Sequence, residues 1–275
     1  MTPVRLGAVG YLNARPMVFG LEQSPLFTVR YDVPSECVRL LHAGDIDIGL
    51  VSSIEYLRGD DYRIVPDLAI TSRGPVLSVA LYTARPIRDV RSIVMDTSSR
   101  TSVALVRVLC ARLFRIEPVI TSSGPDLSAM LTEGDAALII GDNALLWNPA
   151  DVRLKPDATS TKRSIEKIDL GEAWTGLTGL PFVWALWAGR AGALGSREVA
   201  ALRAARDAGA AQPEAIARAF FQDAAEQALG ARYLRDNIKY HLGPDERAGL
   251  EAFYHYAGEI GIAPAFEVGQ ALRFY

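Results

Sequence analysis

Short apolar runs alternate with polar turns and amphipathic stretches along the first two thirds of the 275-residue chain. The runs 4–10, 46–53 and 74–83 have the length and composition of buried strands. The segments 92–114 and 136–146 repeat the order of apolar run, polar turn and helix. Strands that alternate with helices in this way predict an α/β protein with a largely parallel sheet.

Turn-forming residues mark the expected ends of the helices. Ser35 is expected to cap a helix that stops at Gly44, and an earlier helix is expected to begin near Ala14. Strand patterns cease at Ser196, and the rest of the chain has the periodicity of helices. The expected helical stretches are 196–211, 213–230, 231–243 and 244–261.

Two long apolar strands, expected at 74–83 and 180–188, bracket the middle of the chain. This arrangement predicts a two-lobed protein whose first lobe is discontinuous. Residues 1–83 plus 187–275 would form the first lobe and residues 84–186 the second. The two long strands would cross between the lobes, and a ligand would bind in the cleft.

The composition excludes several classes of protein. Hydrophobic residues make up 49% of the chain, an ordinary globular share, and the net charge of −3 offers no field for nucleic acid or an anionic membrane. No apolar run approaches the ~18 residues that cross a bilayer, and no secretory signal follows Met1. We therefore expect a cytoplasmic protein without membrane contact.

The usual signatures of metal, cofactor and covalent chemistry do not occur in this sequence. Cys37 and Cys110 lie in apolar helical patterns and are interpreted as reduced core residues. Phosphate-loop, dinucleotide-binding and nucleophile-triad patterns are not apparent either. The polar stretch 152–164 is interpreted as a surface loop.

Several ordered stretches carry a resemblance to one family. They are GYLNARP (10–16), GDIDIGLVSSIEY (44–56), GPVLSVALYT (74–83), DTSSRTSVALVRVL (96–109), ALIIGDNAL (137–145), DLGEAWTGLTGLPFVWALW (169–187) and YLRDNIKYHLG (233–243). Through them the chain resembles the chorismate dehydratases of the futalosine route to menaquinone. The resemblance spans nearly the full length and is interrupted mainly by an insert at 153–163.

The resemblance implies a type II periplasmic-binding-protein fold reused as a cytoplasmic enzyme, with two crossing strands and a helical C-terminal region. It implies chorismate, a small dicarboxylate, as substrate, and 3-[(1-carboxyvinyl)oxy]benzoate and water as products. Such an enzyme is a carbon–oxygen lyase, and the resemblance implies neither a metal nor an organic cofactor.

A sister enzyme of the same pathway, dihydroxynaphthoate synthase, shares this fold. The sister enzyme carries a histidine at the end of a strand, at the position that corresponds to Gly141 of this chain. The histidines of this chain, His42, His241 and His255, lie in expected helices far from any such turn. The glycine therefore argues against the sister activity.

Asn13 and Ser78 are the candidate catalytic residues. The Asn13 amide could hydrogen-bond a substrate carboxylate or the departing hydroxyl, although its spacing alone favours a helix cap. The resemblance implies that the motif around Asn13 lies at the cleft, and this position favours the catalytic role. Ser78 interrupts a buried strand, so its hydroxyl needs a partner, either a neighbouring carbonyl or the substrate.

Polar turns that follow strands are the candidate substrate-binding groups. A helix begins in the turn 98–102, where unpaired backbone N–H groups suit a carboxylate, although simple capping explains the serines almost as well. A second turn in the first lobe could hold the other carboxylate. The candidates in the two turns are Ser52, Ser53, Ser99, Arg100, Thr101 and Ser102.

Asp142 and Asn143 follow the strand that ends at Gly141 and complete the substrate-binding candidates. Asp142 could act as a base, but an anion there would repel a dianionic substrate, so capping of the next helix is favoured. Trp174, Trp184 and Trp187 are interpreted as core residues, although one aromatic near Phe182 could close over the substrate ring.

The sequence supplies no obvious general base for removal of a ring proton. The enolpyruvyl carboxylate of the substrate could take that proton, and positioning would then be the main contribution of the enzyme. A solute-binding protein for a small carboxylate is the alternative from another class, because it would use the same cleft. A monomer and a homodimer are both compatible with the sequence.

Overall fold

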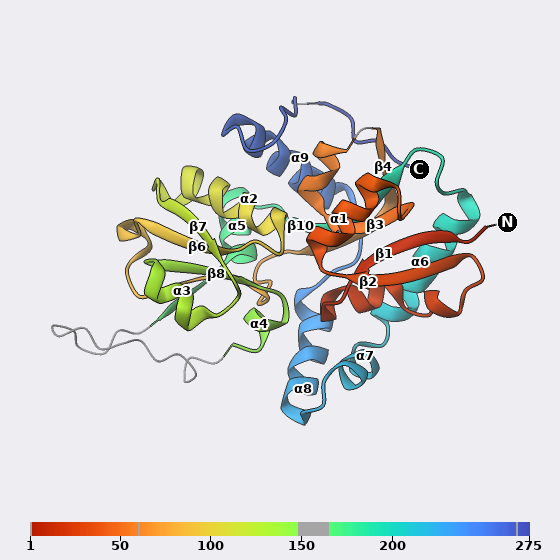
Figure 1. Cartoon of the computed structure of the whole chain (residues 1–275), viewed down its shortest axis with the longest axis horizontal. Coiled ribbons are helices and arrows are strands. Elements are labelled where there is room, and N and C mark those ends of the chain that lie inside the picture. The colour runs from red at the N-terminus through yellow and green to blue at the C-terminus, as the bar shows by residue number, and fades with distance from the viewer. Residues whose placement is uncertain (1, 60, 148–164, 268) are drawn as a thin grey trace.

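The computed structural model describes residues 2–59, 61–147, 165–267 and 269–275, so the loop expected at 152–164 lies outside the described residues. Two five-stranded sheets organise the chain, and we call the region around each sheet a lobe (Figure 1). The first sheet has the order β2 (Phe27–Asp32), β1 (Val4–Val9), β3 (Ile48–Ser52), β10 (Phe182–Arg190) and β4 (Tyr62–Ser72). The second has the order β7 (Val119–Ser123), β6 (Ser92–Asp96), β8 (Ala136–Ile140), β5 (Val79–Thr83) and β9 (Glu166–Asp169).

Helices cover both sheets and extend beyond the first one. The α-helices are α1 (Pro34–Ala43), α2 (Arg100–Leu109), α3 (Leu127–Glu133), α4 (Gly141–Leu145), α5 (Leu170–Thr178), α6 (Ser196–Ala210), α7 (Pro213–Phe220), α8 (Ala224–Arg232) and α9 (Pro244–Glu259). Short 3-10 or π turns are η1 (Leu12–Val18), η2 (Leu21–Gln23), η3 (Ser53–Arg58), η4 (Ile87–Asp89), η5 (Cys110–Phe114) and η7 (Tyr233–Asn237). No helix in this described part of the chain is long and apolar enough to cross a membrane.

The α/β class is confirmed, but the expectation of a largely parallel sheet is wrong. Each sheet contains two parallel and two antiparallel pairings of neighbouring strands. The antiparallel pairings all involve β10 in the first sheet and β5 in the second. Both strands directly follow a passage of the chain from one lobe to the other, and that passage reverses the strand direction.

The same two strands correct the expected crossings. The strand expected at 74–83 begins only at Val79 and pairs with β8 and β9 in the second sheet. The strand expected at 180–188 pairs entirely within the first sheet. Residues 73–78 and 179–181 therefore connect the lobes, and sheet pairing places 79–83 in the second lobe and 182–186 in the first, opposite to the expected boundaries.

Helix ends follow the local sequence, with three corrections. The helix expected over 213–230 is divided into α7 and α8, which residues 221–223 separate. The helix α1 begins at Pro34 after Val33, so Ser35 is not its cap, because proline at the first helical position needs no N–H partner. Its stop at Gly44 is confirmed, with a left-handed φ of 78°. The helix expected over 231–243 ends at Asn237, and Lys239 pairs instead with Thr71 beside the first sheet.

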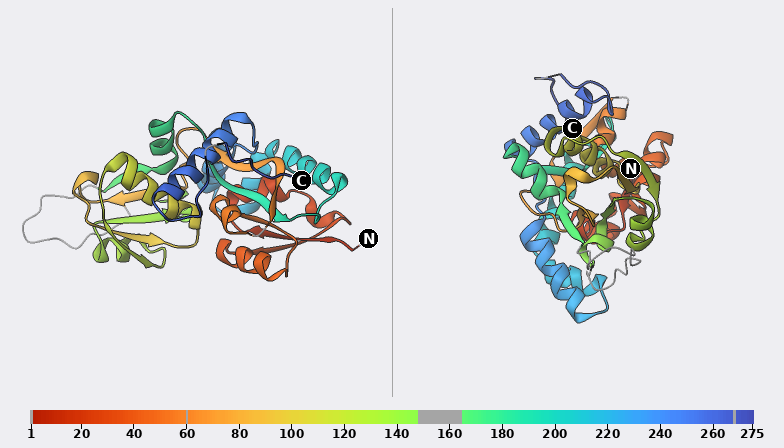
Figure 2. Two further views of the ribbon diagram at one scale, coloured as in Figure 1. Left: turned by 90° about the horizontal axis from the view of Figure 1, so that it is seen from above. Right: turned by 90° about the vertical axis from the view of Figure 1, so that its left-hand side faces the viewer.

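Aromatic packing joins the lobes around α5, and Figure 2 shows α9 at the junction of the two halves. The Trp174 ring of α5 is fully buried and contacts Phe182 of β10 and Phe253 of α9, with centroid distances of 5.2 and 6.1 Å. Its indole N–H donates to the Pro181 carbonyl at 3.1 Å. The core interpretation of Trp174 is thus confirmed, and the ring fixes the second connection between the lobes.

Replacement of Trp174 by alanine is expected to lower the free energy of unfolding by about 3–5 kcal/mol, because it opens a cavity and frees the Pro181 carbonyl. Val119→Ala on β7, where the side chain is 67% exposed, is the control and should change stability by less than about 0.5 kcal/mol. Urea denaturation of both variants measures this, and equal losses would contradict the role of Trp174.

Candidate functional site

The carboxyl ends of four strands meet at one small cavity between the lobes. Strands β1 and β3 end there from the first lobe, and β6 and β8 lead to it from the second. The cavity has a volume of about 60 Å³. Its lining residues are Val9, Tyr11, Asn13, Pro34, Leu50, Ser52, Ile70, Ser78, Val79, Ser99, Ser102, Ile140, Gly141, Trp184 and Ala185. Strand ends facing a crevice are the usual ligand sites of open α/β sheets.

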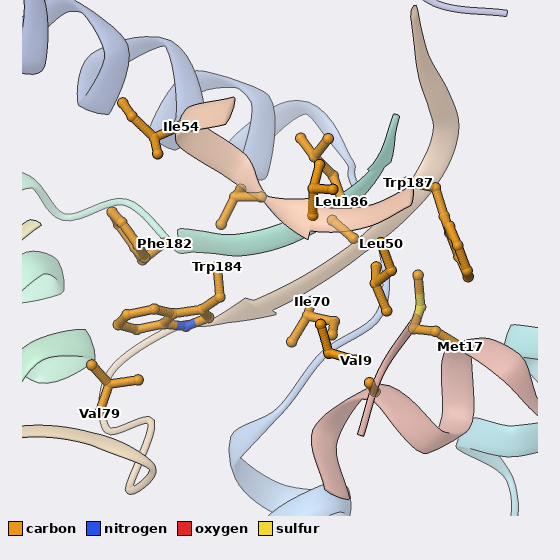
Figure 3. Close-up of a cluster of buried hydrophobic side chains, with 14 of the residues drawn as sticks. Val9, Met17, Leu50, Ile54, Ile70, Val79, Phe182, Trp184, Leu186 and Trp187 are labelled. Atoms are coloured by element: carbon orange, nitrogen blue, oxygen red, sulfur yellow. The ribbon is translucent and has the colours of Figure 1, made fainter. Parts of the chain in front are cut away.

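Five of the ten residues expected to act in the site line this cavity: Asn13, Ser52, Ser78, Ser99 and Ser102. The other five do not line it: Ser53, Arg100, Thr101, Asp142 and Asn143. The cavity wall is otherwise largely apolar, and Figure 3 shows the Trp184 indole with Val79 below it and Ile70 beside it.

One of the two candidate catalytic residues contacts a buried phenol. The Ser78 hydroxyl lies 2.7 Å from the hydroxyl of Tyr233. Asn13 is not the helix cap that its spacing suggested, because it lies inside η1, whose cap position is occupied by Tyr11. The Asn13 amide is therefore available to the cavity.

The turn before α2 combines the two roles that the sequence left open. The Ser99 hydroxyl caps the helix by accepting from the Ser102 backbone N–H at 3.4 Å, and the Ser102 hydroxyl donates to it at 3.0 Å. Both side chains also line the cavity. On the facing lobe, Ser52 precedes η3 without capping it, which leaves its hydroxyl free for a ligand.

Ser53 and Thr101 hold the lobes together. Ser53 donates to the Val183 carbonyl at 2.7 Å, so Thr101 is the donor across the 3.3 Å between their two hydroxyls. Thr101 in turn accepts from the Ile54 backbone N–H at 3.1 Å. These contacts are buried and face away from the cavity, which explains why neither side chain lines it.

Arg100 forms an ion pair between the lobes. Its guanidinium lies 3.3 Å from the carboxylate of Glu55 in η3, which also pairs with Arg58 at 2.8 Å. The Glu55 side chain is 1% exposed and Arg100 is 48% exposed, so the arginine covers a buried carboxylate from solvent. This pairing compensates for a cation in the first turn of a helix, and it directs Arg100 into a neighbouring groove of about 790 Å³.

Asp142 caps a helical turn of the opposite lobe. Its carboxylate accepts from the Leu12 backbone N–H at 3.3 Å, and Ile140 occupies the cap position of α4, so the favoured capping of its own helix is wrong. Burial raises the pKa of Asp142 to about 6, although the Leu12 hydrogen bond and the charge of Arg15 oppose the shift. Asn143 is exposed and does not reach the cavity.

Gly141 has a backbone that excludes a side chain. Its φ is 64°, and a Cβ atom at this position would lie 2.9 Å from the Tyr11 ring. Tyr11 lines the cavity and donates to Ser98 across the lobes at 3.4 Å. A histidine at position 141 would require both a strained backbone and a displaced Tyr11.

Sequence reasoning missed Tyr11 and Tyr233 and left Trp184 only as a possible wall of the site. Tyr11 lies two residues before Asn13 in the GYLNARP stretch. The stretch that identified Asn13 as a candidate could therefore have identified Tyr11 as well. Tyr233 lies 155 positions from Ser78, and no local pattern connects them.

The raised pKa of Asp142 predicts a pH-dependent stability. The native state binds this proton more tightly than the unfolded chain, so its stabilising contribution is present below pH 3.8 and is lost as the pH rises through about 6. Asp142→Asn keeps an oxygen for Leu12 but does not ionise. Relative to this variant, the wild type should lose up to about 1.4 kcal/mol per pH unit across that window. Denaturation curves at a series of pH values measure the difference, and two parallel pH profiles would contradict it.

Comparison with known proteins agrees with this architecture. A family model described as menaquinone biosynthesis matches residues 4–259. The chain is 32% identical over 284 residues to the chorismate dehydratase of Thermus thermophilus, and the match covers 97% of this chain and 99% of that protein.

Solved structures are similar in fold alone. A protein of Archaeoglobus fulgidus superposes with a TM-score of 0.73 at 18% identity, over 95% of this chain and 98% of that one. The periplasmic aliphatic sulphonate binding protein of Escherichia coli superposes with a TM-score of 0.62 at 15% identity, over 100% of this chain and 92% of that one. The two-lobed fold of periplasmic binding proteins is thereby confirmed, and the chain belongs to the menaquinone biosynthesis family.

Proposed function

We propose that this protein is a chorismate dehydratase that converts chorismate into 3-[(1-carboxyvinyl)oxy]benzoate and water, in the cytoplasm. The similarity to the Thermus thermophilus enzyme supports this activity. The observation that carries the proposal is the convergence of Asn13 and Ser78 on one cavity, opposite the serine-rich start of α2. A two-sided arrangement of neutral donors suits a small dianion.

The carboxylates of the substrate would be held by hydroxyls and backbone N–H groups. Ser52 on the first lobe and Ser99 with Ser102 on the second supply hydroxyls, and α2 directs its N-terminus toward the cavity. Within the described residues, no cationic side chain lines the cavity. Hydrogen bonding and the helix dipole therefore carry recognition, and Arg100 has no direct part in it.

Substrate entry requires the lobes to separate. The cavity of about 60 Å³ is far smaller than the roughly 300–1,000 Å³ of ordinary ligand sites. Opening would break the hydrogen bonds of Tyr11, Asp142 and Thr101 across the lobes, and closing around the substrate would restore them or replace them with substrate contacts. The structure thus corresponds to a closed form of the protein.

The dehydration is balanced without a redox cofactor, because no atom is oxidised or reduced by an external group. The proton on C3 of the ring passes to the enolpyruvyl carboxylate of the substrate, and the C4–O bond breaks. The departing oxygen takes up this same proton from the enolpyruvyl carboxylate and leaves as water while the ring becomes aromatic. Ser78 and Asn13 would hydrogen-bond the departing oxygen and hold the enolpyruvyl group over the ring.

Assignment of the base to the substrate follows from the side chains at the cavity. Within the described residues, its lining contains no carboxylate, imidazole or amine. Asp142 lies outside this lining and is occupied by Leu12. Dihydroxynaphthoate synthase, which would need a histidine at position 141, is disfavoured by the backbone of Gly141.

Incubation with chorismate tests the proposed activity and distinguishes it from solute binding. Mass spectrometry should detect a product lighter than chorismate by one water, formed in many turnovers per protein molecule. Asn13→Ala should slow its formation, because the amide no longer orients the substrate. Quantitative recovery of unchanged chorismate from the wild type would contradict the activity and favour a binding protein.

Ser78→Ala should lower kcat by about 10²–10³-fold, which is the usual cost of losing one hydrogen-bond donor to a developing negative charge. Ser122→Ala removes an exposed serine hydroxyl on β7 outside the cavity and should leave kcat unchanged. Steady-state kinetics of both variants measure the contrast. Equal rates for the two variants would remove Ser78 from the reaction.

A further inference from the structure

We propose that Tyr233 is a positioning residue for the dehydration, since its hydroxyl holds the Ser78 hydroxyl from behind the cavity wall. The proposal rests on the proposed function of the site. Tyr233 belongs to η7 in the helical C-terminal region, and its side chain is 1% exposed. It does not line the cavity, so it acts through Ser78, which does.

The phenol holds the candidate catalytic serine. Its oxygen lies 2.7 Å from the Ser78 hydroxyl. Ser78 lies in the connection 73–78 between the lobes, and Tyr233 lies in η7. One group from the C-terminal helices therefore fixes a side chain in the connection between the lobes.

Burial keeps this phenol protonated. Burial raises the pKa of Tyr233 far above its ordinary value, while the hydrogen bond with Ser78 lowers it by less. A neutral phenol has one proton to donate and an oxygen that accepts.

The direction of this hydrogen bond follows from that proton count. Because the phenol is buried, its proton needs an acceptor, and the Ser78 oxygen lies within hydrogen-bonding distance, so the phenol donates to Ser78. The Ser78 proton is then free to point into the cavity, where the departing oxygen of the substrate would accept it as a hydrogen bond.

A second buried tyrosine offers a matched control. Tyr240 is 4% exposed, and its hydroxyl has no hydrogen-bond partner within the described residues. Burial, and then the nearby Tyr233, raise the pKa of Tyr240, so the two phenols lie in one region. Removal of this hydroxyl leaves no group unpaired, so Tyr240→Phe tests the cost of losing a buried phenolic oxygen in this region.

The experiment compares Tyr233→Phe, Tyr240→Phe, Ser78→Ala and the double variant Tyr233→Phe/Ser78→Ala in steady-state turnover of chorismate. Tyr233→Phe should lower kcat by about 10- to 100-fold, with a much smaller change in KM, because misplacement of the acting groups weakens the transition state more than binding. Tyr240→Phe should stay within about twofold of the wild type. The double variant should be about as slow as Ser78→Ala alone, since Tyr233 acts through Ser78.

The results that would contradict the proposed function differ from those that would contradict the positioning role of Tyr233. A wild type that leaves chorismate unchanged overturns the proposed function and this proposal with it. An active wild type with an unchanged kcat in Tyr233→Phe, or multiplied losses in the double variant, overturns the positioning role alone. If Tyr233→Phe does not fold, 3-fluorotyrosine at this position keeps the hydroxyl and alters its acidity. A kcat equal to that of the wild type would then overturn the proposal.

Discussion

Buried hydrogen bonds between the two lobes are the interaction on which the site depends. Thr101 bridges to Ser53 and Ile54, while Asp142 accepts from Leu12. Each of these groups leaves water when the lobes meet, and a buried polar group without a partner costs about 1–3 kcal/mol. Closure is therefore stable only in the register that pairs them all, and that register brings four strand ends around one cavity.

The same constraint explains how a site without a charged side chain in its described lining can act on a dianion. Neutral donors from both lobes are fixed by partners outside the cavity, as Ser99 is by Ser102 and Ser78 by Tyr233. Donors that are already oriented need little reorganisation when charge develops on a departing oxygen. Exclusion of water by the closed lobes strengthens each of these hydrogen bonds.

Local pattern was enough to predict the α/β class, most strands and the turns that form the cavity, because strand ends and polar caps are encoded by neighbouring residues. The polar interruption at Ser78 and the motif around Asn13 identified two residues that do lie at the cavity. Pairing over long separations was not predictable. Glu55 and Arg100 meet across 45 positions, and which sheet accepts β5 depends on the reversal of the chain at the connection.

A crystal structure with 3-[(1-carboxyvinyl)oxy]benzoate bound tests the central claim most directly. The account predicts the molecule between the lobes, with one carboxylate at the start of α2, and with Asn13 and Ser78 both within hydrogen-bonding distance. A product molecule bound to one lobe only, or bound outside the space enclosed by the four strand ends, would contradict it.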